Sequence, residues 1–97
     1  MKTLKEINYI LKEHKEEILQ KYRAKVKGVF GSYVRAEENK ESDIDVLVEF
    51  EDNANLIDFV GLSLFLEEKL KCRVDVVPED AIRKEIKPSI LREAVYL

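Results

Sequence analysis

An alternating segment sets the architecture of this chain: residues 43–50 read DIDVLVEF. Successive side chains of a β-strand point to opposite faces of a sheet, so one face of a strand collects every second residue. One face of this segment is apolar, and it consists of Ile44, Val46, Val48 and Phe50. The opposite face begins with two acids, and it consists of Asp43, Asp45, Leu47 and Glu49. The segment is therefore predicted to be a strand that presents two carboxylates from its first residues.

Helical and strand-like patterns flank this segment on both sides. Thr3 and Glu6 fit a helical capping box, apolar residues then recur at helical spacing, and Gly31 and Ser32 stop a short β-rich run. The predicted elements are a helix over 4–23, strands over 26–30 and 43–50, a helix over 56–70, a strand over 73–77 that ends at Pro78, and one or two short helices within 79–97. This order predicts an α/β (α+β) fold with a small mixed three-stranded sheet covered by helices.

The C-terminal segment carries its own signals. Pro88 is expected to interrupt the helical pattern there, and Ser89 is a candidate helix cap. An apolar stripe follows, formed by Ile90, Leu91, Ala94 and Val95.

Length and composition limit the class of protein. With 97 residues the chain is expected to form one domain, residues 1–97, without a separate substrate-binding domain. Seventeen Lys and Arg against 20 Asp and Glu give a net charge of −3, which disfavours direct binding of nucleic acid. Cys72 is the single cysteine, the N-terminus lacks an apolar signal core, and no stretch approaches the ~18 apolar residues of a membrane span. A cytoplasmic protein without a membrane partner is expected.

Two short motifs are predicted to share one site. Gly31 and Ser32 end one strand, while Asp43 and Asp45 begin the next, so antiparallel pairing would bring both motifs to the same edge of the sheet. Asp75 is the only other acid within an apolar strand. It would complete a cluster of three carboxylates if its strand lay beside residues 43–50 with Asp75 level with the aspartates.

Such a site suits phosphoryl chemistry. Neighbouring carboxylates repel one another, and a hard cation such as Mg²⁺ relieves that repulsion. Two such ions can activate an attacking hydroxyl and stabilise the leaving oxygen. Gly31 allows backbone N–H groups to approach a phosphate, and the Ser32 hydroxyl can donate one more hydrogen bond. Arg35, three residues further on, is expected to reach the same phosphates.

These residues resemble a known family. GSYVRAE over 31–37, followed by SDIDVLV over 42–48, is similar to the signature of the minimal nucleotidyltransferases of the DNA polymerase β superfamily. The resemblance covers nearly the whole chain. Val34 and Ala36 stand where the family typically has Ala and Gly around the arginine, which leaves the role of Arg35 open.

The resemblance implies a nucleotidyltransferase fold and a role for each matched residue. Gly31 and Ser32 would hold the nucleotide triphosphate, with Arg35 as a further nucleotide-binding candidate. Asp43, Asp45 and Asp75 would be the catalytic and Mg²⁺-binding residues, and Asp75 would also act as the base toward the acceptor hydroxyl.

The resemblance also implies a partner. Single-domain members of the family are commonly antitoxins paired with HEPN-domain ribonuclease toxins, and they resemble protein adenylyltransferases that move AMP from ATP to a toxin tyrosine. The chain is therefore expected to be an antitoxin that modifies its toxin in a Mg²⁺-dependent reaction and releases pyrophosphate, as part of a homo- or hetero-oligomer. Chain length agrees, because the predicted elements use nearly all 97 residues and the acceptor must bring its own surface.

Two alternatives stay open. One is a non-catalytic antitoxin that blocks its toxin by binding, with the C-terminal apolar stripe docked on a partner helix. The other is a small-molecule nucleotidyltransferase completed by an oligomeric neighbour. The residues themselves do not select tyrosine over serine or a small molecule as acceptor.

Overall fold

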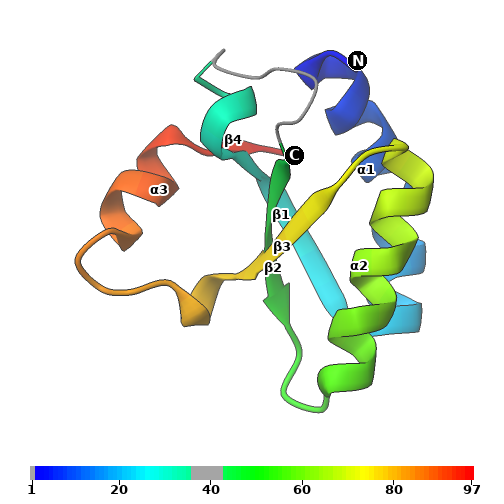
Figure 1. Cartoon of the computed structure of the whole chain (residues 1–97). Helices are drawn as coiled ribbons and strands as arrows, with labels where there is room; N and C mark the ends of the chain where they lie inside the picture. The colour runs from blue at the N-terminus through cyan, green and yellow to red at the C-terminus, as the bar shows by residue number, and fades with distance from the viewer. Residues whose placement is uncertain (1, 36–42) are drawn as a thin grey trace.

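The computed structural model describes residues 2–35 and 43–97 as one mixed sheet with helices around it (Figure 1). The elements in chain order are α1 (Leu4–Tyr22), β1 (Ala24–Phe30), the 3₁₀ turn η1 (Gly31–Tyr33), β2 (Ile44–Phe50), α2 (Leu56–Leu70), β3 (Val74–Pro78), the 3₁₀ turn η2 (Glu79–Ala81), α3 (Lys87–Glu93) and β4 (Val95–Tyr96).

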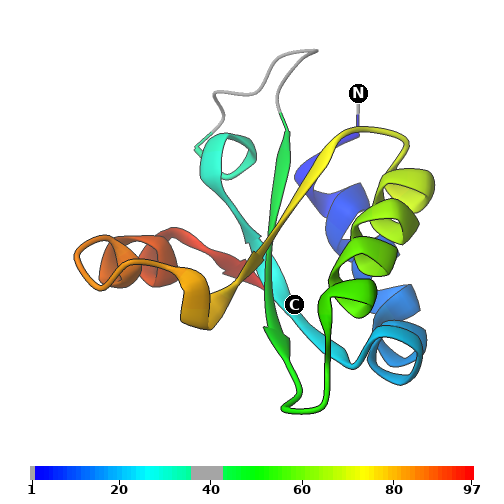
Figure 2. The same ribbon diagram turned by 60° about the horizontal axis from the view of Figure 1, so that its bottom comes forward.

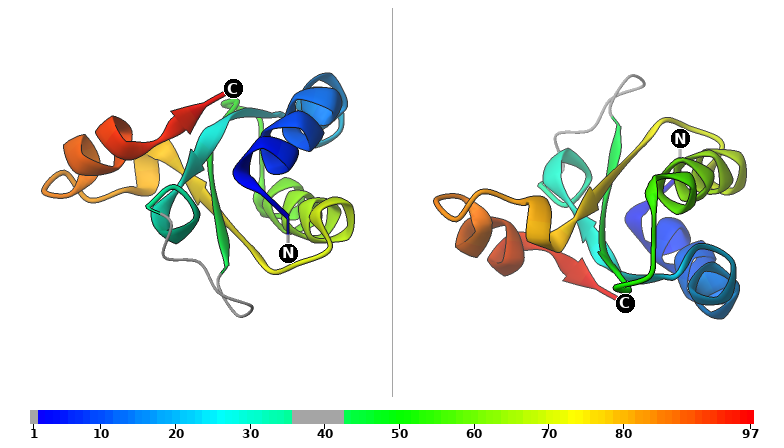
Figure 3. Two further views of the ribbon diagram at one scale, coloured as in Figure 1. Left: turned by 90° about the horizontal axis from the view of Figure 1, so that it is seen from above. Right: turned by 90° about the horizontal axis from the view of Figure 1, so that it is seen from below.

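The sheet has the strand order β3-β2-β1-β4. β1 pairs antiparallel with β2 and with β4, whereas β2 and β3 run parallel. Parallel neighbours need a crossover, and α2 supplies it between β2 and β3. α1 and α2 cover one face of the sheet, while α3 lies on the other side, as Figure 2 and Figure 3 show. The predicted α/β class is confirmed.

The core lies between the sheet and the pair α1 and α2. The alternation predicted for residues 43–50 is confirmed, since Ile44, Val46 and Val48 are all fully buried there. Helix residues that meet them include Leu11 from α1 and Leu66 from α2. Leu47 points to the opposite face and is also fully buried, so that face is covered in its middle. The open part of the second face is its edge, where the aspartates lie.

The sheet has four strands, whereas three were predicted, because the C-terminal segment adds β4. Val95 and Tyr96 leave the helix and pair with Val29 and Gly28 of β1. This pairing satisfies backbone groups at an edge of β1 that would otherwise stay open. It also requires Gly28, because a Cβ there would overlap the Val95 carbonyl oxygen and lie 2.9 Å from Tyr96 Cα.

The predicted break at Pro88 is also wrong. Pro88 lies in the first turn of α3, where a residue without an N–H group loses no helical hydrogen bond. Ile86 occupies the N-cap position, and Ser89, the predicted cap, lies inside the helix. The stripe predicted to dock a partner helix is divided, because α3 ends at Glu93 and Val95 belongs to β4.

The remaining elements were predicted closely. α2 has the predicted bounds, α1 ends one residue early, and β1 begins two residues earlier than expected. None of the helices within residues 2–35 and 43–97 is both long and apolar enough to cross a membrane.

A buried acid ties the two core helices together. Asp58 is 6 % exposed and forms a capping box with Asn55 at the start of α2. Its Oδ1 also accepts a hydrogen bond of 3.1 Å from Nη1 of Arg23, which caps the end of α1 in a left-handed conformation with φ 53°. The pair therefore fixes the end of one helix against the beginning of the other.

Replacing this acid is expected to destabilise the fold. Asp58→Ala should lower the free energy of unfolding by about 2 kcal/mol, because the Asn55 N–H loses its half of the capping box and Arg23 loses its acceptor. Asp58→Asn, which keeps an acceptor oxygen, should lose about half as much. Urea denaturation measures both, with Glu68→Ala on the exposed side of α2 as the control. A loss for Asp58→Ala no larger than that for Glu68→Ala would contradict this role.

Candidate active site

Three aspartates share one edge of the sheet, where β2 and β3 begin. The parallel register pairs Asp45 with Asp75, and Asp43 directly precedes β2. Paired residues in neighbouring strands point to the same face, so Asp45 and Asp75 both lie on the face opposite the α1 and α2 core. The predicted placement of Asp75 level with Asp45 is confirmed. Asp45 is partly buried, whereas Asp75 is exposed.

The electrostatics of this edge centre on Asp45. The pKa of its carboxyl is raised from the ordinary value of 3.8 to about 6, mainly by burial and then by the nearby charges of Asp75 and Asp43. Arg35 opposes this effect and Glu93 adds to it. A carboxylate that is costly to ionise beside two other acids favours binding of a cation.

The site fits Mg²⁺ by the chemistry of its donors. Asp43, Asp45 and Asp75 supply the hard carboxylate oxygens that this ion prefers. Within residues 2–35 and 43–97, no three acid, histidine or cysteine side chains already converge closely enough to hold a metal. The Asp43 Oδ1 lies 3.7 Å from Nε of the exposed Arg73 instead. Holding one ion with all three aspartates would therefore require side-chain rotation.

The raised pKa predicts how stability depends on pH in Mg²⁺-free buffer. Ionising Asp45 costs more in the folded chain than in the unfolded one, so the destabilisation is absent below pH 3.8 and complete above about pH 6. Asp45→Asn should therefore stabilise the fold at pH 7.5 by about 1 to 2 kcal/mol, because solvent screening reduces the full value of about 3 kcal/mol. Near pH 3.5 the gain should vanish. Urea denaturation at both pH values checks this, and an equal gain at both would contradict it.

The Gly31-Ser32 turn lies beside Asp45. Phe30, the last residue of β1, pairs with Asp45, and Gly31 follows it at once. Gly31 has φ +85°, and a Cβ there would overlap Asp45 Oδ2 and lie 3.1 Å from Asp45 Cγ. Glycine is thus required both by the left-handed backbone and by the close approach to the carboxylate. Ser32 is partly exposed in η1. The two predicted motifs therefore meet, as antiparallel pairing of their strands requires.

Arg35 lies where the turn ends, but its observed partner is a protein carboxylate. Its Nη1 donates a hydrogen bond of 2.8 Å to Oε1 of Glu93, the last residue of α3. The same oxygen accepts a 3.0 Å hydrogen bond from the backbone N–H of Gly31. The predicted contact of Arg35 with phosphates stays a prediction.

Glu93 was not found by the sequence analysis. It follows Arg92 in a short helix, and its partners Gly31 and Arg35 are 62 and 58 residues away. No local pattern marks such a contact. Ala36, Glu37 and Ser42, which belong to the two quoted motifs, lie outside the described residues.

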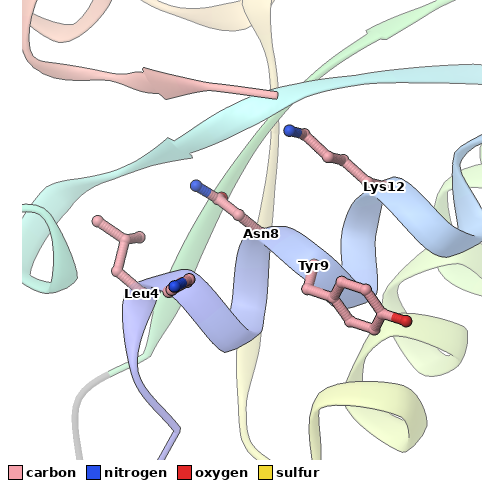
Figure 4. Close-up of a pocket in the computed structure, with 5 residues that line it drawn as sticks. Leu4, Asn8, Tyr9 and Lys12 are labelled. Atoms are coloured by element: carbon pink, nitrogen blue, oxygen red, sulfur yellow. The ribbon is translucent and has the colours of Figure 1, made fainter.

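A separate hollow lies on α1. Figure 4 shows it beside Leu4, Asn8, Tyr9 and Lys12, and Lys5 completes its lining. It contains none of the predicted site residues. At the carboxylate edge Asp75 is exposed, which suits a site that receives its second substrate from outside the chain.

Fold and site together define a class of protein. A mixed sheet that brings an Asp-x-Asp strand, an adjacent strand aspartate and a Gly-Ser turn to one edge is the arrangement expected of a nucleotidyltransferase. The family model for the nucleotidyltransferase domain matches residues 11–97. The chain belongs to the nucleotidyltransferase domain family, and it is a nucleotidyltransferase of the minimal type.

The chain is also similar over its whole length to named relatives. The chain is 43 % identical over 97 residues to protein adenylyltransferase MntA of Thermococcus cleftensis, covering 100 % of this chain and 98 % of the relative. It is 37 % identical over 98 residues to a Methanocaldococcus jannaschii protein provisionally named a protein adenylyltransferase, with both chains fully covered.

Solved structures share the fold. One, provisionally described as a minimal nucleotidyltransferase, has a TM-score of 0.82 and 34 % identity, and the match covers 99 % of this chain and 97 % of that chain. A second, with a TM-score of 0.69 and 23 % identity, covers 93 % of this chain and 70 % of that chain. It is described as the crystal structure of a toxin-antitoxin with AMP-PNP, and it shows a common fold.

Proposed function

We propose that this protein is the antitoxin of a toxin-antitoxin pair and acts as a Mg²⁺-dependent protein adenylyltransferase. It transfers AMP from ATP to a hydroxyl of the partner toxin and releases pyrophosphate. The observation that carries the proposal is the meeting of Asp45, Asp75 and the Gly31 turn at one open edge of the sheet. Support comes from the relative named protein adenylyltransferase and from the structural neighbour described as a toxin-antitoxin with an ATP analogue.

Each residue has a proposed part in the reaction. Gly31 lets the backbone of the turn approach the triphosphate closely while its own N–H donates to Glu93, and Ser32 binds the triphosphate through its backbone N–H and hydroxyl. Asp43, Asp45 and Asp75 hold Mg²⁺, as two ions, which when bound offset the negative charge of the triphosphate and polarise the α-phosphate.

The transfer step forms one bond and breaks one. The acceptor oxygen attacks the α-phosphorus, and the bond from that phosphorus to the oxygen bridging to the β-phosphate breaks as pyrophosphate leaves. The acceptor proton passes to the Asp75 carboxylate and then to water. Asp75 suits this part because it is the exposed member of the paired aspartates and can be reached from outside the chain.

The acceptor is proposed to be a tyrosine of a helical HEPN-type toxin. The described elements pack around a single sheet, with the carboxylate edge open to the surface. The relative named protein adenylyltransferase is of nearly equal length, which supports a reaction in which a second protein supplies the acceptor surface.

Labelled ATP tests the proposal. The protein is incubated with Mg²⁺, ATP labelled at the α-phosphate, and the protein encoded by the neighbouring gene. We expect label in that neighbour, and none when EDTA is added or when Asp43→Ala/Asp45→Ala replaces the wild type. Full neutralisation of the toxin by this variant without label would instead support an antitoxin that acts by binding. Label in a small hydroxyl compound alone would support the small-molecule enzyme.

A further inference from the structure

One glutamate far from both motifs holds the turn and the arginine together. We infer that Glu93 is a positioning residue for the nucleotide site: its carboxylate fixes the Gly31 amide and the Arg35 guanidinium in the arrangement that receives the triphosphate. The inference rests on the proposed function only in taking ATP as the nucleotide.

The geometry shows how one oxygen performs both tasks. Glu93 Oε1 accepts from the Gly31 N–H at 3.0 Å and from Arg35 Nη1 at 2.8 Å. Its side chain is 28 % exposed, while that of Arg35 is 47 % exposed. Hydrogen bonds to an ionised acceptor at these lengths are stronger than neutral ones, and partial burial limits competition from water.

The held groups are the ones that border Asp45. Gly31 contacts the Asp45 carboxylate so closely that no side chain fits between them. Arg35 and Glu93 both act on the charge of Asp45 through space, in opposite directions. A shift of the Gly31 backbone or of the Arg35 side chain would therefore change the position and the potential of the carboxylate edge together.

Glu93 also links this edge to the C-terminal segment. It ends α3, and β4, which follows after Ala94, is hydrogen-bonded to β1 at Gly28 and Val29. The glutamate is thus anchored to the same strand that leads into the Gly31 turn. This anchoring lets Glu93 set the orientation of Arg35 without contact with the substrate.

Binding of AMP-PNP with Mg²⁺, followed by calorimetry, provides the first test, because it needs no acceptor protein. Glu93→Ala should weaken binding about tenfold, since a charge-assisted acceptor for two groups is lost. Glu93→Gln, which keeps an oxygen at this place, should recover most of the affinity. Glu85→Ala, an exposed acid on the segment before α3, is the matched control and should bind like the wild type.

A double-mutant cycle separates positioning from a general structural role. If Glu93 acts by orienting Arg35, Glu93→Ala and Arg35→Lys should be non-additive, so that the double variant binds AMP-PNP nearly as well as the weaker single variant. Fully additive losses would overturn the inference. Tighter binding of AMP-PNP by Glu93→Ala or Glu93→Gln would overturn it too. That result would mean that the Glu93 carboxylate occupies the place of a phosphate and competes with the nucleotide.

Amide NMR tests the same contact without nucleotide. In Glu93→Gln the Gly31 amide resonance should move upfield and the Arg35 Nη resonances should shift, whereas the Gly61 amide should not. Unchanged Gly31 and Arg35 resonances would contradict the positioning role. Failure of the wild type to bind AMP-PNP would count against the proposed function. The Gly31 and Arg35 resonances would still test whether Glu93 positions these two residues, because that measurement needs no nucleotide.

Discussion

Asp45→Asn is expected to lower AMP transfer at least about a thousandfold while making the protein more stable at neutral pH. The loss follows because an amide has no charge to hold a cation against the triphosphate. The gain follows because the ionised Asp45 is destabilised by burial and by Asp75 and Asp43. Loss of activity together with higher stability cannot arise from unfolding. The rate of label transfer and a urea denaturation curve on the same preparation measure both.

Asp52→Asn is the matched control for this prediction. Asp52 is an exposed acid in the turn after β2, outside the carboxylate edge, and its variant should transfer AMP at the wild-type rate. Asp45→Asn with at least a tenth of wild-type activity would show that this carboxylate is not part of the catalytic machinery.

Gly31→Ala is expected to have the second-largest effect. The added Cβ must be accommodated at φ +85° and would overlap Asp45 Oδ2, so the turn or the carboxylate has to move. We expect a loss of about 2 to 4 kcal/mol in the free energy of unfolding. Mg²⁺-dependent AMP-PNP binding should fall at least about a hundredfold, because the turn and Asp45 are displaced together.

Gly61→Ala offers the same chemical change in a different setting. Its Cβ would meet only the ring of Tyr22, at 2.8 Å from Cε1, and Gly61 lies within a helix, where alanine is favoured. Some loss of stability from displacing the Tyr22 ring, but unaltered nucleotide binding, is expected. If Gly31→Ala bound the nucleotide as well as Gly61→Ala does, the proposed role of the Gly31 turn in nucleotide binding would be contradicted.

The sequence was sufficient wherever a pattern was local. Alternation over residues 43–50 predicted the face on which Asp45 lies, and the two motifs were expected to meet if their strands paired antiparallel, as β1 and β2 do. The carboxylate cluster was expected only if Asp75 lay level with the other aspartates, and the register of β2 and β3 meets that condition for Asp45. In each case the burial of apolar side chains on one face leaves a single register.

The C-terminal segment could not be predicted in this way. β4 has two residues, too few for an alternation, and its pairing depends on Gly28 nearly 70 positions earlier. Glu93 was missed for the same reason, since a carboxylate in a short amphipathic helix resembles any solvated acid until its partners are known. Residue roles, Mg²⁺ and the cytoplasmic location stay predictions.

The mass of the intact toxin partner, measured after incubation with this protein, ATP and Mg²⁺, distinguishes AMP transfer from binding. We expect a toxin heavier by one or more AMP groups, with no increase when Asp45→Asn replaces the wild type. ATP labelled at the α-phosphate should mark the toxin, and ATP labelled at the γ-phosphate should not. A toxin of unchanged mass that is nevertheless neutralised would contradict catalysis and leave binding alone as the antitoxin activity.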